Sequence, residues 1–227
     1  MFVFCLCLFV FCLLCFFINQ CSKVKLASFV LYCLCRACVR AVFFLFGILT
    51  ALHVVGSQSM TSQVLARAKT GTGKTMGFLL PAVEKMVRHG TSGQFCSVLV
   101  LSPTRELASQ IENEAVKLTK FHRSIQVVCV VGGTNINTDK KRLAQKVDIL
   151  VATPGRLQDH LKNTAGVLQK LSQIQVLCLD EADQLLEMGF RPDIERILAM
   201  LGPMAGRQTL LFSATVPDGV HKVSQLA

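Results

Sequence analysis

The residues with the clearest chemistry form a glycine-rich loop after a short apolar run. The loop reads Ala-Lys-Thr-Gly-Thr-Gly-Lys-Thr, which is the spacing of a phosphate-binding loop. Glycines let its backbone N–H groups turn onto phosphate oxygens, and the helix that follows adds its positive end. Lys74 would reach the β and γ phosphates, and Thr75 would bind Mg²⁺. An ordinary glycine-rich turn is the alternative. The predicted nucleotide-binding residues are Ala68, Thr70, Gly71, Thr72, Gly73, Lys74 and Thr75.

A second candidate site is the acidic cluster that follows the apolar run Val176–Leu179. Asp180 is predicted to hold Mg²⁺, mostly through water, because that ion keeps several waters. Glu181 is then free to position or activate an attacking water. The alternative is a helix start enriched in acids, since carboxylates favour that end of the helix dipole. Together with the phosphate loop, the cluster predicts Lys74, Asp180 and Glu181 as catalytic residues, with Thr75 and Asp180 as metal ligands.

The elements that position these motifs can be predicted from the sequence. Apolar runs, which predict strands, alternate with amphipathic stretches, which predict helices. The predicted strands are Gln63–Arg67, Cys96–Leu101, Gln126–Val131, Asp148–Ala152, Val176–Leu179 and Thr209–Phe212. The predicted helices lie near Thr75–Arg88, Arg105–Phe121, Lys140–Gln145, Gly155–Lys162 and Pro192–Leu201. Such alternation indicates an α/β domain whose mostly parallel sheet is covered by helices on both faces. Ligands of open α/β sheets bind at the carboxyl ends of strands, where these motifs fall.

Taken in order, the motifs resemble those of the DEAD-box ATP-dependent RNA helicases. The phosphate loop matches that family, Ala68 included, and Asp180–Asp183 matches the motif that names it. The other matching segments are Pro103–Leu107, Gly132-Gly133, Thr153–Arg156, Met188–Arg191 and Ser213–Thr215. The resemblance covers about Gln63–Pro217 and implies a RecA-like phosphate-loop NTPase domain.

The resemblance also implies ATP and Mg²⁺ as cofactors, RNA as a partner, and roles for the matched residues. Ser213 and Thr215 would couple the nucleotide state to the RNA side, although a helix cap is the plainer alternative. Loop N–H groups and an Arg at a helix start would bind RNA phosphates without reading bases. The implied RNA-binding residues are Pro103, Thr104, Arg105, Gly132, Gly133, Thr153, Gly155 and Arg156.

Two features depart from the family pattern. The family's nucleotide-recognising Gln segment has no clear match upstream of the loop, and the chain stops at Ala227 without the second RecA-like domain and its arginine finger. The expected function is therefore the ATP-binding half of an RNA helicase, which hydrolyses ATP and remodels RNA once a second domain completes it. The alternatives are a phosphate-loop ATPase that does not act on RNA, and a non-catalytic ATP- and RNA-binding fragment or membrane-tethered isoform.

Residues 1–56 differ from the rest, and the helicase domain is predicted over residues 57–227. Phe, Cys, Leu and Val make up 36 of the first 55 residues, and no acidic residue precedes Glu84. A signal peptide fits poorly because no basic stretch comes first. The segment is interpreted either as translated non-coding sequence, since these residues share T-rich codons, or as a membrane anchor. The anchor would make the protein membrane-associated.

Charge and cysteine content add little about function. The net charge is +10, but residues 1–83 contribute +7, so the body is only mildly basic and charge alone does not predict nucleic-acid binding. Eight of the 11 cysteines lie before residue 39. The others, Cys96, Cys129 and Cys178, sit in apolar runs and are predicted to be buried free thiols. They favour a reducing, intracellular compartment.

Overall fold

The computed structural model describes residues 64–67, 73–89, 93–122, 124–202, 207–215, 219–220 and 222–223. The predicted extension at residues 1–56, its boundary, and Ala68, Thr70, Gly71 and Thr72 of the glycine-rich loop lie outside these residues. Within the described part of the chain, no helix combines the length and the apolar character needed to cross a bilayer.

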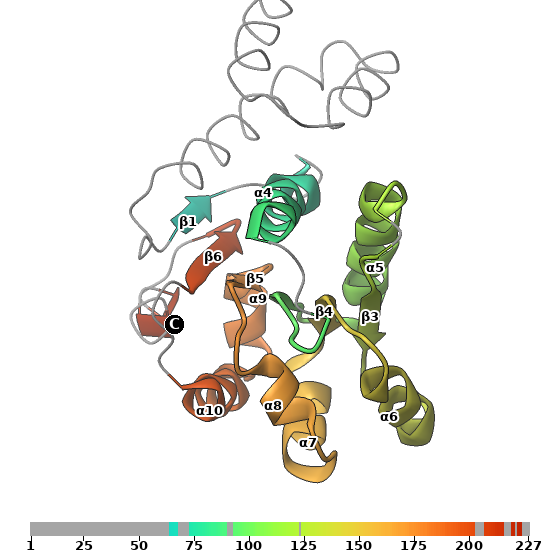
Figure 1. Ribbon diagram of the computed structural model, residues 1–227. Coiled ribbons are helices and arrows are strands. Elements are labelled where there is room, and N and C mark those ends of the chain that lie inside the picture. The colour runs from blue at the N-terminus through green and yellow to red at the C-terminus, as the bar shows by residue number, and fades with distance from the viewer. Residues whose placement is uncertain are drawn as a thin grey trace, which may run out of the picture. The chain divides into compact units, whose positions relative to one another are not determined.

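Six strands in the described residues form one sheet in which every neighbouring pair is parallel. The order across the sheet is β1-β6-β5-β2-β4-β3, so β1 and β3 are the edges (Figure 1). The strands are β1 (Val64–Arg67), β2 (Val98–Leu101), β3 (Val127–Val130), β4 (Ile149–Ala152), β5 (Val176–Leu179) and β6 (Gln208–Ser213). The predicted α/β class with a parallel sheet is confirmed.

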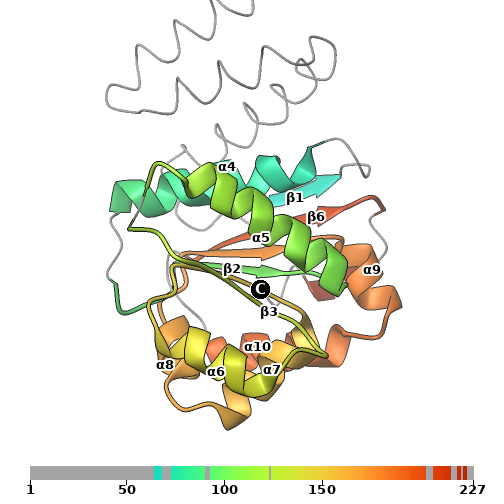
Figure 2. The same ribbon diagram turned by 90° about the vertical axis from the view of Figure 1, so that its right-hand side faces the viewer.

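Helices cover both faces of this sheet, which explains why its central strands are continuous apolar runs. Figure 2 shows α4 and α5 on one face, with α6, α7, α8 and α10 on the other. Their bounds are α4 (Lys74–His89), α5 (Arg105–Thr119), α6 (Ile136–Ala144), α7 (Pro154–Asn163), α8 (Val167–Leu171), α9 (Ala182–Glu187) and α10 (Arg191–Leu201). The short helix α9 starts two residues after β5 ends.

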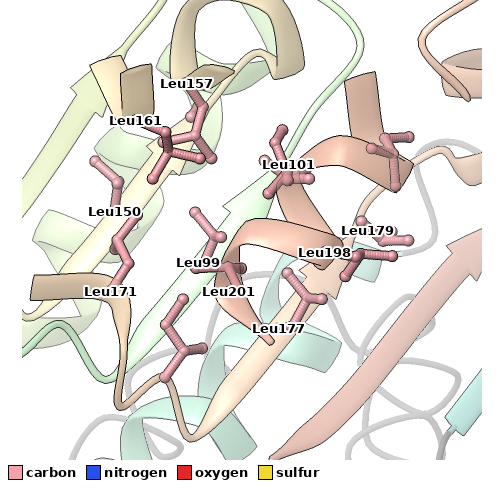
Figure 3. Packing of buried hydrophobic residues seen from close by; sticks show 14 of the residues in the cluster. Leu99, Leu101, Leu150, Leu157, Leu161, Leu171, Leu177, Leu179, Leu198 and Leu201 are labelled. Atoms are coloured by element: carbon pink, nitrogen blue, oxygen red, sulfur yellow. The ribbon is translucent and has the colours of Figure 1, made fainter. Parts of the chain in front are cut away.

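The register of the central strands builds a layer of leucines beneath α7 and α10. Leu99 pairs with Leu150 on one side and with Leu177 on the other. All three side chains are 0% exposed, and they lie in the cluster drawn in Figure 3. On the opposite face, the rings of Phe78 and Phe212 lie 5.5 Å apart between α4 and β6. These two layers hold the strand ends, and therefore the motifs, in place.

Three details of the helices differ from the prediction. The helix predicted to start at Lys140 begins at Ile136, because the side chain of Asn135 accepts a hydrogen bond from the Asn137 N–H at 2.9 Å and caps it. Neither α8 nor α9 was predicted, since helices of five and six residues are too short to show a periodic apolar pattern.

The three cysteines of the domain are buried and free, as predicted. Burial raises the pKa of Cys96 to about 12 and that of Cys129 to about 12, and it also raises the pKa of Cys178. A thiol with a raised pKa is a poor nucleophile and a poor metal ligand. These cysteines therefore belong to the core.

Candidate functional site

The parallel strands bring the motif residues to one edge of the sheet. Lys74 starts the helix after β1, Asp180 directly follows β5, and Ser213 ends β6. These three strands are neighbours, in the order β1-β6-β5. The segments that follow β2, β4 and β3 carry the remaining motifs, and these strands form the other half of the sheet. We call the ends of β1, β6 and β5 the first half of this edge, and the ends of β2, β4 and β3 the second half.

In the first half, the structure brings together the three predicted catalytic residues. The Nζ atom of Lys74 lies 3.4 Å from Oε1 of Glu181, and both side chains are largely buried, at 7% and 13% exposed. Asp180 lies beside them and is 1% exposed. One lysine therefore faces two carboxylates in a space with little water.

Asp180 is held by the backbone rather than by an ion pair. Its N–H donates to the Leu101 carbonyl at 2.9 Å, and its Oδ1 accepts from the Glu181 N–H at 3.1 Å. Burial raises the pKa of Asp180 from 3.8 to about 6; the charge of Lys74 opposes this shift, and that of Glu181 adds to it. At this carboxylate the effect of burial on the pKa therefore outweighs the opposing charge of Lys74.

Glu181 has an unusual backbone conformation. With φ +50° and ψ +53°, it is left-handed, and it is the one non-glycine residue with positive φ among the described residues. That conformation destabilises a residue with a Cβ by roughly 1–2 kcal/mol. It turns the chain sharply between β5 and α9, so that adjacent carboxylates point into the same site. Strain of this kind concentrates at functional sites.

Asp183 lies in the first turn of α9 and is held by residues at the end of β6. Its Oδ2 accepts from both the N–H and the hydroxyl of Thr215, each at 2.9 Å. The Ser213 hydroxyl accepts from the Asp183 N–H at 3.2 Å. Burial alone would raise the pKa of Asp183, but these hydrogen bonds, chiefly from Thr215, lower it below its ordinary value. The predicted coupling residues Ser213 and Thr215 are thereby tied to the acidic motif.

Only the last part of the glycine-rich loop falls within the described residues. Gly73 has φ +83°, a conformation that suits glycine, and its carbonyl accepts from the Gly77 N–H at 3.1 Å as α4 begins. Thr75 lies in the first turn of that helix and is half-buried. Among the described residues, no group of three or more His, Cys, Asp or Glu side chains could hold a metal ion. A cation here would need oxygen ligands beyond Thr75 and Asp180.

In the second half, Arg105 lies over the double glycine. Thr104 caps α5 by accepting from the Leu107 N–H at 3.2 Å, which places Arg105 at the exposed helix start. A Cβ on Gly133 would lie 2.1 Å from Nη1 of Arg105, and Gly133 also has φ +81°. The positive φ favours glycine at this position, whereas the flexible end of the Arg105 side chain could move aside for a Cβ. Pro103, which precedes the cap residue of α5, is buried.

Thr153 and Arg156 support the same loop from α7. The hydroxyl of Thr153 accepts from the Gly132 N–H at 3.3 Å. The guanidinium of Arg156 donates to Asp139 at 3.0 Å and to the hydroxyl and carbonyl of Thr134, and only 10% of its side chain is exposed. Gly155 has open space where a Cβ would stand. Of the predicted RNA-binding residues, Arg105, Gly133 and Gly155 are therefore accessible, whereas Thr153 and Arg156 mainly hold the loop.

Sequence reasoning missed three residues of this edge. Asp183 was noticed as part of the acidic motif but received no role. Asp139 and His160 were not noticed at all, although both are nearly inaccessible, at 3% and 0% exposed. No local pattern revealed them, because the contacts that join them come from distant positions: Asp139 contacts Arg156, 17 positions away, and His160, 21 positions away.

The sequence and structure are similar to those of known helicases. A family model described as DEAD/DEAH box helicase matches residues 51–223. DEAD-box ATP-dependent RNA helicase 26 of Oryza sativa subsp. japonica is 53% identical over 165 residues, covering 72% of this chain and 30% of the relative. The helicase of the same number from Arabidopsis thaliana is 52% identical over 170 residues, covering 72% of this chain and 20% of the relative. The chain thus spans less than a third of these relatives.

Among solved structures, Mss116p bound to ssRNA and AMP-PNP is 35% identical, with a TM-score of 0.68. That match covers 77% of this chain and 35% of Mss116p. The predicted RecA-like fold is confirmed by this likeness. Since the family model matches well over half of the residues, the chain belongs to the DEAD/DEAH box helicase family.

Proposed function

We propose that this chain is the ATP-binding half of an ATP-dependent RNA helicase. The observation that carries the proposal is the pair of sites at one sheet edge. One half gathers Lys74, Asp180 and Glu181, and the other presents Arg105 over a double glycine. The two plant relatives are named DEAD-box ATP-dependent RNA helicases, and the Mss116p structure is bound to ssRNA and AMP-PNP. The proposed ligands here are ATP with Mg²⁺, and RNA.

The donors in the first half fit Mg²⁺. The Asp180 carboxylate and the Thr75 hydroxyl are hard oxygen ligands, and this ion is commonly held by few protein groups together with phosphates and waters. When bound, Mg²⁺ would neutralise charge on the β and γ phosphate oxygens. It would also offset the buried negative charge of Asp180.

Lys74 and Glu181 would exchange partners when ATP binds. Lys74 now donates to Glu181, and a γ phosphate would draw this ammonium away because phosphate offers more negative charge. The freed Glu181 carboxylate would accept a hydrogen bond from the attacking water and orient it. Asp183 would transmit the change through its hydrogen bonds to Thr215.

The second half would hold RNA by its phosphates. The helices α5, α6 and α7 each begin where a strand of this half ends, so three positive helix ends face the same edge. Arg105 adds a full charge at that place. Contacts of this kind go to the RNA backbone, so binding would be independent of sequence and weakened by salt.

The test is titration of the purified full chain with a labelled single-stranded oligouridine, with and without an ATP analogue and Mg²⁺. We expect binding that strengthens with nucleotide and weakens as salt rises. Arg105→Gln should reduce the affinity roughly tenfold, as for loss of one charged contact. The matched control is Arg196→Gln, because Arg196 pairs with Asp193 on the surface of α10 and should leave RNA binding unchanged.

Two results would contradict the proposal. If the chain binds the nucleotide but no RNA at any salt concentration, a phosphate-loop ATPase without RNA activity becomes the better interpretation. If Arg105→Gln and Arg196→Gln behave alike, RNA binding does not involve this edge.

A further inference from the structure

A buried carboxylate lies behind the second half of the edge. Asp139 is on α6, and its Oδ2 atom has three polar neighbours: Arg156 Nε at 3.0 Å, Thr134 Oγ1 at 3.1 Å and His160 Nε2 at 3.4 Å. The residue is 3% exposed, so these neighbours replace the water that a carboxylate needs. One side chain thus joins α6, α7 and the β3–α6 loop.

Arg156 links Asp139 to the β3–α6 loop. While Nε meets Asp139, Nη2 donates to both the hydroxyl and the carbonyl of Thr134. Thr134 directly follows Gly133, where the guanidinium of Arg105 rests. The contacts therefore run from Asp139 through Arg156 to the loop that supports Arg105.

His160 contacts the same carboxylate oxygen of Asp139 and helps to orient it. Its Nδ1 lies 3.0 Å from the Thr164 hydroxyl, and its Nε2 faces Asp139. Because an ionised carboxylate only accepts, Nε2 must carry the proton and Nδ1 must accept from Thr164. Burial lowers the pKa of His160, against the opposing effect of Asp139, so the ring is neutral near pH 7. Arg156 then provides the positive charge that balances Asp139.

We propose that Asp139, oriented by His160, is a positioning residue for RNA binding: it holds Arg156 so that the Gly132–Thr134 loop stays under Arg105. This inference rests on the proposed function. Arg156 acts here mainly through the loop, because its guanidinium is occupied by Asp139 and Thr134 and is largely buried. A purely structural cluster that joins α6 to α7 is the competing explanation.

A double-mutant cycle on the purified full chain separates the two explanations. Asp139→Asn keeps the shape of the side chain and removes its charge. We expect RNA affinity, measured with labelled oligouridine at saturating ATP analogue, to fall roughly 3- to 10-fold. Affinity for the fluorescent ATP analogue with Mg²⁺ should stay unchanged. In an Arg156→Gln background, Asp139→Asn should cause no further loss. Asp159→Asn is the matched control, since Asp159 is exposed and adjoins His160.

Either of two results overturns the inference: additive losses of Asp139→Asn and Arg156→Gln, or parallel losses of RNA and nucleotide affinity. If Asp139→Asn fails to fold, His160 provides the test. His160→Ala should weaken RNA binding, and His160→Gln, which keeps an N–H donor, should restore it. RNA binding by His160→Ala equal to wild type would also overturn the inference. A wild-type chain that binds no RNA refutes the proposed function as well, so the two failures are distinguishable.

Discussion

The two halves of the sheet edge differ in the surroundings of their buried carboxylates. In the half formed by β1, β6 and β5, Asp180 is buried, forms no ion pair with a residue that the structure describes, and has its pKa raised by burial to about 6. In the half formed by β2, β4 and β3, the Oδ2 atom of the buried Asp139 pairs with Arg156 at 3.0 Å and also lies 3.1 Å from the Thr134 hydroxyl and 3.4 Å from His160 Nε2. Burial dominates at the first carboxylate, whereas an ion pair and hydrogen bonds offset burial at the second.

The difference indicates how each half would meet its ligand. A site that carries unbalanced buried charge gains most when a ligand supplies the missing charge, so ligand binding there also relieves a local instability. A site whose charges are already paired is preorganised, and it offers a fixed surface to an extended ligand. The first arrangement suits a nucleotide with its cation, and the second suits a phosphate backbone.

The largest effect on ligand binding is expected from Lys74→Ala, which removes the ammonium that lies 3.4 Å from Glu181 in the first half. Affinity for ATP with Mg²⁺ should fall roughly 100-fold, as for loss of a charge-assisted contact with phosphate. RNA affinity without nucleotide should not change. Titration with a fluorescent ATP analogue measures the effect. Lys117→Ala on the surface of α5 is the control, and equal nucleotide affinity in both variants would show that Lys74 does not contact the phosphates.

Asp180→Asn should stabilise the nucleotide-free chain and weaken its Mg²⁺-dependent nucleotide binding, although less than Lys74→Ala does. Because the pKa of Asp180 in the folded state, about 6, exceeds 3.8, wild-type stability falls as pH rises between these values. The gain from the substitution should be near zero at about pH 4 and reach roughly 3 kcal/mol near pH 7. Urea unfolding at both pH values measures it.

The surface variant Asp193→Asn is the control for that experiment, since Asp193 is partly exposed beside Arg196. It should show no gain. An Asp180→Asn chain that is no more stable than wild type near pH 7 would mean that this carboxylate is compensated after all.

Gly133→Ala tests the preorganised half. The positive φ of +81° should destabilise the fold by roughly 1 kcal/mol. The new Cβ would also displace Arg105, so RNA affinity should fall about tenfold. Gly166→Ala is a close control, because Gly166 has the same φ of +81° but open space around it. Equal RNA affinity in the two variants would show that the position of Arg105 does not affect RNA binding.

The smallest effect is expected from Glu181→Gly, which removes the strained Cβ in the first half. The free energy of unfolding should rise by about 1 kcal/mol, because glycine adopts a left-handed conformation without strain. Glu181→Gln loses the same charge but keeps the Cβ, so it should show no such gain. Chemical denaturation of both variants measures the difference. Equal stability of the two would indicate that the conformation is unstrained.

Local features of the sequence were enough to predict the six strands, five of the seven described helices and the motif positions. The apolar run at Val176–Leu179 predicted β5 with the bounds that the structure shows, and the acids after it mark the strand end. The glycine-rich loop predicted a helix start close to Lys74. These predictions succeed because strand burial, helix periodicity and loop chemistry each depend on residues within a few positions of one another.

The tertiary structure alone decided the order of the strands and the partners of the buried polar groups. Nothing near Asp139 in the sequence indicates that it is buried against Arg156, and nothing near Asp183 indicates its bonds to Thr215, 32 positions away. The left-handed turn at Glu181 is likewise set by the strand and helix on either side of it. A buried polar group needs a partner to replace water, and that partner comes from whichever segment the packing of the sheet brings near.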